Sequence, residues 1–136
     1  LSVVWRNKKL EQNYIKPVSL YQKNLGKIGE DLALNFLKSH SFSILEKNFR
    51  SKFGEIDIIA EKNHCLYFIE VKTRSNLDHG YPHEAVNKRK IYHIKKVAQY
   101  YLLKNNYSDY KLKVGVFSIL IEGAKTEIKF WDDIES

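Results

Sequence analysis

Two carboxylates, Asp57 and Glu70, occupy positions from which two predicted strands would bring them together. Residues 54–61 and 65–73 each have the composition of a strand. The Asn-His pair between them favours a two-residue hairpin turn, because asparagine tolerates a positive φ. Counting back from this turn places Asp57 directly opposite Glu70. Directly opposed Cβ atoms of an antiparallel pair lie about 5 Å apart. The sequence therefore predicts two carboxylates held side by side.

Like charges that face each other among apolar residues destabilise a fold unless positive charge lies beside them. Lys72 follows Glu70 by two residues, so it shares its face and lies opposite Glu55 in this register. A divalent cation would meet the need better, because Mg²⁺ takes one or two carboxylates together with water and phosphate oxygens. Such an ion activates water and stabilises charge on a phosphodiester. The pattern indicates metal-assisted phosphodiester hydrolysis; the alternative is a structural ion-pair network, because acid-x-Lys is common on strands.

Five strand patterns and two helical patterns surround these acids. The strands are expected at residues 43–49, 54–61, 65–73, 113–121 and 126–131. Apolar residues at spacings of three and four predict helices over residues 22–38 and 84–103. The second helix supplies the crossover that a parallel strand pair requires. The order αβββαββ therefore predicts an α/β fold whose mixed central sheet is flanked by helices.

The composition is that of one globular domain with an excess of basic residues. The chain has 136 residues, of which 43% are apolar, and its 23 Lys and Arg against 16 Asp and Glu give a formal charge of +7. Length and apolar content together are sufficient for a single hydrophobic core. Residues 1–21 lack a clear period and contain four lysines and arginines against a single acid, Glu11. We expect a basic N-terminal arm there and a folded domain over residues 22–136.

Several classes of protein are excluded. The single Cys65 rules out a disulfide framework and a multi-cysteine zinc site, which favours a reducing compartment, the cytoplasm. The longest nearly apolar run, residues 114–121, is far shorter than the roughly 20 residues of a membrane helix. His79 and His83 lack a third ligand for zinc. The chain contains no glycine-rich phosphate loop, dinucleotide fingerprint or Ser-His-Asp set, so we expect no small-molecule cofactor.

The acid positions also resemble a known motif. Gly54-Glu55-Ile56-Asp57 followed by Glu70-Val71-Lys72 is similar to the PD-(D/E)XK nuclease motif. Four further blocks accompany it: GKIGE at residues 26–30, NFR at 48–50, KTR at 72–74 and GYPHEAV at 80–86. In this order, over residues 22–134, the blocks resemble the YraN family of uncharacterised, endonuclease-like bacterial proteins. That family is itself similar to archaeal Holliday junction resolvases.

The resemblance implies a restriction-endonuclease-like core and a catalytic set of Glu30, Asp57, Glu70 and Lys72. In such a site Asp57 and Glu70 bind Mg²⁺ or Mn²⁺, and Lys72 orients or activates the attacking water. Glu30 would reach the metal region from the first helix, although the helix dipole alone also favours an acid there. Resemblance to resolvases implies a DNA substrate with a branched structure, and a homodimer, because two strands would require two active sites.

One departure from the family leaves a second function open. Gly115 stands where family members often have an aspartate in an Arg-Phe-Asp segment. A chain that lacks this acid could keep the nuclease fold as a non-catalytic module that binds nucleic acid or another partner. The retained set of four predicted catalytic residues favours the enzyme.

Basic residues predict contacts with the phosphates of nucleic acid. Residues 87–108 contain six lysines and arginines and no acid, and we expect Lys88, Arg89 and Lys95 to contact DNA. Arg50 and Arg74 flank the acids and are expected to bind phosphate, because arginine offers a planar pair of donors. The alternatives are a solvated helix face for the lysines and surface ion pairs for the arginines.

Tyrosines near these basic residues have two interpretations. The residues concerned are Tyr81, Tyr92, Tyr100 and Tyr101. Packing in the core or at its rim is the favoured one, and stacking on unpaired bases is the alternative.

Overall fold

The structure, a computed structural model, describes residues 24–135, so the predicted arm of residues 1–21 lies outside the described part. The elements are α2 (Leu25–Ser39), β1 (Ser43–Ser51), β2 (Gly54–Lys62), β3 (Cys65–Arg74), the 3-10 helix η2 (Pro82–Ala85), α3 (Lys88–Lys104), β4 (Lys111–Glu122) and β5 (Lys125–Trp131). The strands form one sheet in the order β1-β2-β3-β4-β5. Strands β3 and β4 are parallel and the other neighbours are antiparallel. The predicted α/β class and mixed sheet are confirmed, and the architecture is consistent with a restriction-endonuclease-like core.

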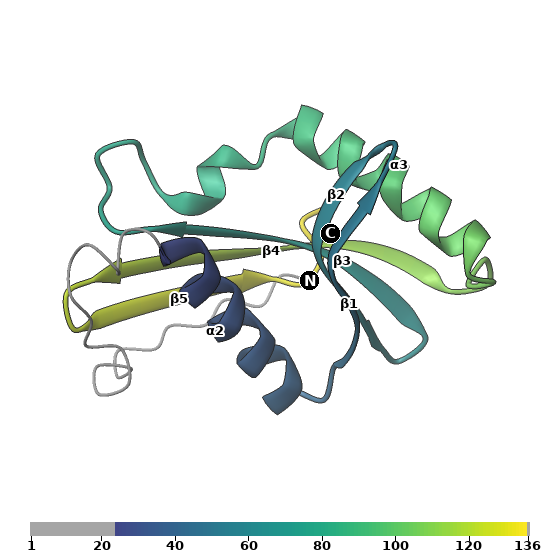
Figure 1. Ribbon diagram of the computed structural model, residues 1–136, viewed down its shortest axis with the longest axis horizontal. Coiled ribbons are helices and arrows are strands. Elements are labelled where there is room, and N and C mark those ends of the chain that lie inside the picture. The colour runs from purple at the N-terminus through teal and green to yellow at the C-terminus, as the bar shows by residue number, and fades with distance from the viewer. Residues whose placement is uncertain (1–23, 136) are drawn as a thin grey trace.

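Each face of the sheet has its own apolar core, because α2 and α3 lie on opposite sides of it (Figure 1). Under α2 the rings of Phe117 and Phe130 stack with centroids 4.2 Å apart. Under α3 the ring of Phe68 meets Tyr101 edge-on at 5.9 Å. Because helices cover both faces, the first six residues of β3 are all buried. Within residues 24–135, none of the helices is both long and apolar enough to cross a bilayer.

The predicted hairpin turn between β2 and β3 is confirmed. Asn63 and His64 have φ values of 52° and 63°, the left-handed pair that a two-residue hairpin requires. Histidine is an unusual residue in this conformation. Its ring stacks on Tyr110 with centroids 3.9 Å apart, and its Nε2 lies 3.3 Å from a carboxylate oxygen of Asp109. Contacts from the segment before β4 thus stabilise this turn, whose Asn-His sequence by itself only weakly favours a two-residue hairpin.

The second helix begins later than its apolar pattern predicts. Residues Pro82–Ala85 form η2, and α3 starts only at Lys88. Asn87 sets this start, because its backbone is extended and its side chain accepts a hydrogen bond from the Lys90 N–H at 2.9 Å. His83 fixes η2 to β4 by donating its backbone N–H to Ser118 Oγ at 3.1 Å. The cap places Lys90 in the first turn of α3.

Helix α2 approaches β3 closely at Gly29, which gives a test of the packing. A Cβ at Gly29 would lie 1.8 Å from Thr73 Oγ1 and 2.9 Å from Thr73 Cβ, so Gly29→Ala must push the helix away. We expect the free energy of unfolding to fall by roughly 1–3 kcal/mol, measured by urea denaturation. Gly26→Ala on the same helix is the control: nothing lies within 4 Å of its Cβ, so it should not destabilise the fold. Equal effects at both positions would contradict the close approach.

Candidate active site

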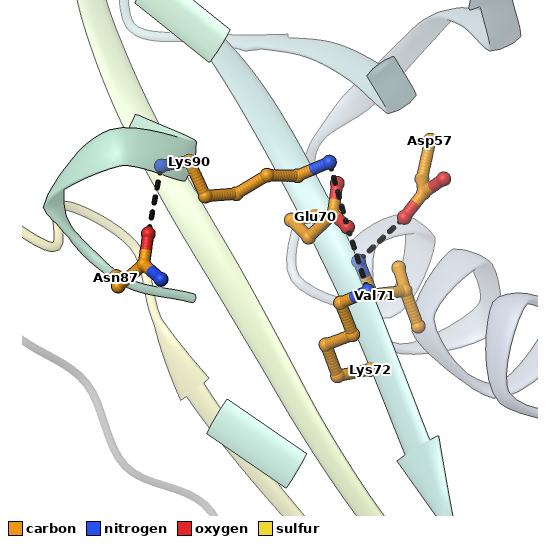
Figure 2. Close-up of polar contacts among 6 residues, drawn as sticks. All are labelled: Asp57, Glu70, Val71, Lys72, Asn87 and Lys90. Atoms are coloured by element: carbon orange, nitrogen blue, oxygen red, sulfur yellow. Dashed lines mark hydrogen bonds and ion pairs between the residues drawn. The ribbon is translucent and has the colours of Figure 1, made fainter. Parts of the chain in front are cut away.

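Strands β2 and β3 separate at Asp57. Their backbone pairing follows the predicted register from the turn as far as Ile58 opposite Ile69. One residue further on, Oδ2 of Asp57 accepts the backbone N–H of Val71 at 2.8 Å, as Figure 2 shows. The Asp57 side chain thus accepts a β3 backbone hydrogen bond at the point where backbone pairing between β2 and β3 ends. The same hydrogen bond fixes the Asp57 carboxylate at the gap between the strands.

The regular alternation of β2 also breaks at this point. Ile58 packs under α2, while both Ile56 and Ile59 pack under α3. Residues two apart in a regular strand share a face, so an irregularity lies between Ile56 and Ile58. The prediction that Asp57 shares one regular face with Glu55, Glu70 and Lys72 is therefore wrong in its geometry. Glu55 does not pair with Lys72; its Oε1 lies 3.3 Å from Arg50 Nε on β1.

Glu70 is buried, and two lysines neutralise it. The residue is 5% exposed. Its Oε2 lies 3.3 Å from Nζ of Lys72 and 3.6 Å from Nζ of Lys90, as drawn in Figure 2. A carboxylate at this depth is costly unless it is paired, and the loss of a partner from a buried pair is more costly still. The two ammonium groups therefore offset the free-energy cost of burying the Glu70 carboxylate.

Lys90 is the site residue that the sequence interpretation missed. It belongs to α3, twenty positions after Glu70, and was expected only as one of several basic residues on the helix. A local signal did exist, since Asn87 three residues earlier is a good N-cap and places Lys90 in the first turn. Which way that turn faces depends on how α3 packs against the sheet.

The four predicted catalytic residues do come together. Glu30, Asp57, Glu70 and Lys72 all line one cleft with a volume of about 430 Å³. The remaining lining residues are Gly26, Glu55, Val71, Thr73 and Lys90. Helix α2 brings Glu30 to this cleft from one face of the sheet, and α3 brings Lys90 from the other. The acids are thus supplied by three different elements around the gap between β2 and β3.

Burial and mutual repulsion perturb two of these acids. Burial first, and then the charge of Glu70, raise the pKa of Asp57 to about 6, although the Val71 N–H and the lysines oppose the rise. The pKa of Glu30 is also raised, first by burial and then by Asp57, while a hydrogen bond with Asn48 opposes the rise. Asn48 has a φ of 52° within β1, a conformation that asparagine tolerates better than most residues. The sequence interpretation gave Asn48 no role of its own.

The carboxylate pair suits a cation of the Mg²⁺ type. Oδ2 of Asp57 accepts the Val71 N–H, which leaves Oδ1 for a second partner. Burial and then the charge of Glu70 raise the pKa of Asp57 in spite of the two lysines, so a further cation beside this carboxylate would be favourable. Among residues 24–135, no three His, Cys, Asp or Glu side chains converge into a ligand set. Mg²⁺ does not require one, since one or two carboxylates suffice when waters and substrate phosphates complete its coordination.

Gly115 lies away from the cleft. A Cβ at this position would lie 3.1 Å from Ile69 Cγ1 and 3.3 Å from Phe130 Cε1. Both neighbours belong to the apolar core under α2, and no residue of β4 lines the acid cleft. The aspartate that the resemblance would place at Gly115 therefore does not correspond to a lining position of the cleft.

The residues predicted to bind phosphate differ in their surroundings. Arg50 is ion-paired with Glu55, and Lys95 Nζ lies 2.7 Å from an oxygen of Glu135. Arg74 donates to the backbone carbonyl oxygens of His79 and Gly80, so it holds the loop after β3. Lys88 and Arg89 are exposed at the start of α3. Their contacts with nucleic acid stay predictions.

Comparison with known proteins places this arrangement in a family. The sequence model of the uncharacterised protein family UPF0102 matches residues 29–120. The chain belongs to this family. UPF0102 is the YraN family, so the resemblance noted in the sequence is confirmed.

Three UPF0102 relatives illustrate the match. The UPF0102 protein of Dictyoglomus turgidum is 43% identical over 110 residues, which are 81% of this chain and 92% of the relative. That of Acetivibrio thermocellus is 47% identical over 111 residues, 81% of each chain. That of Fusobacterium nucleatum is 46% identical over 98 residues, 72% of this chain and 82% of the relative. The family is uncharacterised, so membership assigns no activity.

Asp57→Asn is expected to stabilise the protein at neutral pH, by an amount on the order of 1–2 kcal/mol. The change removes a charge that burial and Glu70 disfavour, and the amide oxygen can still accept the Val71 N–H. With a pKa of about 6 against an ordinary 3.8, folded Asp57 binds its proton more tightly than unfolded Asp57. Wild-type stability therefore falls as the pH rises through this interval.

Urea denaturation of both proteins between low and neutral pH measures this difference. The advantage of the variant should be small near pH 4, grow up to about pH 6 and then stay constant. Glu122→Gln, a change at the exposed acid that ends β4, is the control and should show no such dependence. An advantage that does not vary with pH would contradict the raised pKa.

Proposed function

We propose that this UPF0102 protein is a metal-dependent endonuclease that hydrolyses phosphodiester bonds in DNA. The observation that supports the proposal is the pair formed by Asp57 and buried Glu70, beside Lys72, in an open cleft. An acid with a raised pKa that lies beside a second carboxylate in a cleft is typical of sites that bind a cation or move protons. Structural ion pairs can also shift pKa values. A purely structural pair, however, does not require an acid with a raised pKa, such as Asp57, beside an open cleft.

Each residue of the cleft has a role in this proposal. Asp57 and Glu70 would hold Mg²⁺ or Mn²⁺, and the bound ion would supply an activated water and stabilise charge on the phosphate. Lys72, held beside Glu70, would orient the attacking water. Glu30 would bind water in the same cleft, and its raised pKa makes it a better proton acceptor than an ordinary glutamate.

The wider surface supports DNA as the substrate. The formal charge of +7 attracts a polyanion, and Lys88 and Arg89 are exposed on the helix that carries Lys90 into the cleft. The preference for branched DNA and the homodimer are proposals that rest on the resemblance to resolvases. We place the protein in the cytoplasm, a proposal that the buried free thiol of Cys65 supports.

Cleavage assays test the activity. We expect Mg²⁺- or Mn²⁺-dependent cleavage of nicked, branched or linear DNA, abolished by EDTA. Asp57→Ala and Lys72→Ala should each reduce the rate by about 100-fold or more, because both act on the reacting phosphate or its water. Glu122→Ala, at an exposed acid far along β4, is the matched control and should retain the wild-type rate. Equal cleavage by wild type and Asp57→Ala would indicate a contaminating nuclease and remove the enzymatic claim.

Metal binding can be tested without catalysis. Mn²⁺ should raise the melting temperature of the wild-type protein by several degrees, since a ligand at 100 times its Kd stabilises by about 2.7 kcal/mol. Asp57→Asn should lose this response, because the amide is a poor ligand and the repulsion that favours the cation is gone. Glu122→Gln is the control, and sodium chloride at the same ionic strength corrects for screening. A shift retained in Asp57→Asn would place the ion elsewhere.

A further inference from the structure

The solvent face of α3 carries a row in which lysine and tyrosine alternate. The row consists of Lys88, Tyr92, Lys96, Tyr100 and Lys104. Side chains four apart on a helix are neighbours, so these residues form a continuous ridge over most of the helix. The opposite side of α3 packs on the sheet through Ile94, Val97, Ala98, Tyr101 and Leu102. We call the exposed ridge the lysine–tyrosine row.

Cations lie over the rings of this row. Lys96 Nζ is 5.3 Å from the ring centroid of Tyr92, and Lys104 Nζ is 5.6 Å from that of Tyr100. The turn between β1 and β2 extends the surface. Phe53 meets Tyr100 edge-on at 5.4 Å, and Lys52 Nζ lies 5.2 Å from the ring of Phe53. Aromatic rings and ammonium groups thus alternate over a surface formed by two segments.

The rings of Tyr92 and Phe53 are exposed, and Tyr100 is half-buried. Tyr92 is 56% exposed and Phe53 is 45% exposed, whereas Tyr101 on the inner side is 4% exposed. Tyr101 is the tyrosine that packs with Phe49 and Phe68. The prediction that these tyrosines pack in the core or at its rim is confirmed for Tyr101 in the core and for half-buried Tyr100 at the rim, and it is wrong for Tyr92. Exposed rings that contribute little to folding require another explanation.

The lysines of the row are available to an anionic partner. Within residues 24–135, Lys88, Lys96 and Lys104 have no carboxylate at ion-pair distance, in contrast to Lys90 and Lys95. Residues 87–108 contain no acid, so nothing on the helix itself offsets their charge. The row therefore combines a positive field with one exposed ring, Tyr92, and one half-buried ring, Tyr100.

We infer that the lysine–tyrosine row binds single-stranded nucleic acid. Ammonium groups pair with phosphates of any sequence, and flat aromatic side chains stack on bases that lack a partner strand. A duplex offers the same phosphates but buries the faces of its bases, so the rings would contribute nothing to binding it. An acidic protein would use the lysines and leave the alternating rings without a role.

The row lies next to the proposed active site. Lys90, on the inner side of α3, lines the acid cleft, and Phe53 precedes Glu55 of the same cleft by two residues. Figure 1 shows α3 along the edge of the molecule, above the strands that carry the acids. A single strand on the row would thus adjoin the phosphate to be cut. That the bound strand is also the strand to be cut rests on the proposed function, whereas binding of a single strand to the row does not.

Fluorescence anisotropy in EDTA tests the inference on the full chain. The probes are a labelled thymidine strand of about 16 nucleotides, a duplex and an RNA strand of the same length. We expect the wild type to bind the single strands more tightly than the duplex. Tyr92→Ala with Tyr100→Ala should weaken single-strand binding by about 5-fold or more per ring and leave duplex binding unchanged. Tyr92→Phe with Tyr100→Phe should retain the wild-type affinity, because the rings remain.

Charge variants and controls complete the test. Lys96→Gln with Lys104→Gln should reduce the slope of log Kd against log salt by about 1.4, since each contact to a single strand contributes about 0.7. Lys38→Gln on α2, at an exposed lysine outside the row, should change neither slope nor affinity. Alanine variants that bind the single strand as well as the phenylalanine variants would overturn the inference. Absence of metal-dependent cleavage by the wild-type protein, with intact single-strand binding, would overturn the proposed activity alone.

Discussion

A carboxylate buried inside a mixed sheet is the constraint on which the rest of this structure depends. Glu70 is 5% exposed, and an acid this deep is tolerated only beside positive charge. Lys72 and Lys90 supply that charge from two elements and contact the same oxygen. Asp57 adds a second acid, and burial together with the charge of Glu70 raises its pKa despite both lysines. The fold thus maintains a locally unfavourable pair of acids, which is typical of sites kept for function.

The same constraint explains the shape of the sheet around the acids. Where Asp57 accepts the Val71 N–H, a side chain replaces the ladder, and β2 and β3 separate. Residues of both helices line the cleft at this gap. Helix α2 approaches β3 at Gly29 and contributes Glu30, while the capped first turn of α3 contributes Lys90. Packing, capping and electrostatics therefore converge on one cleft.

Helix α3 joins two surfaces of opposite character. Its inner side delivers one ammonium group to an acidic cleft, and its outer side presents lysines and tyrosines to solvent. An anionic site would by itself repel a polyanion. A basic surface on the same helix offsets that repulsion and raises the local concentration of nucleic acid near the cleft.

The sequence by itself determined the order of elements, the register of the β2–β3 hairpin and the approach of Asp57 to Glu70. Periodicity and turn chemistry are local, and the pattern of acids follows from them. Tertiary structure alone decided that β2 changes face at Asp57, that Glu55 pairs with Arg50, and that Lys90 completes the site. These features depend on contacts between segments that are distant in the chain. The local sequence permits more than one conformation at each of these positions, and the packing of a helix or a strand end selects one of them.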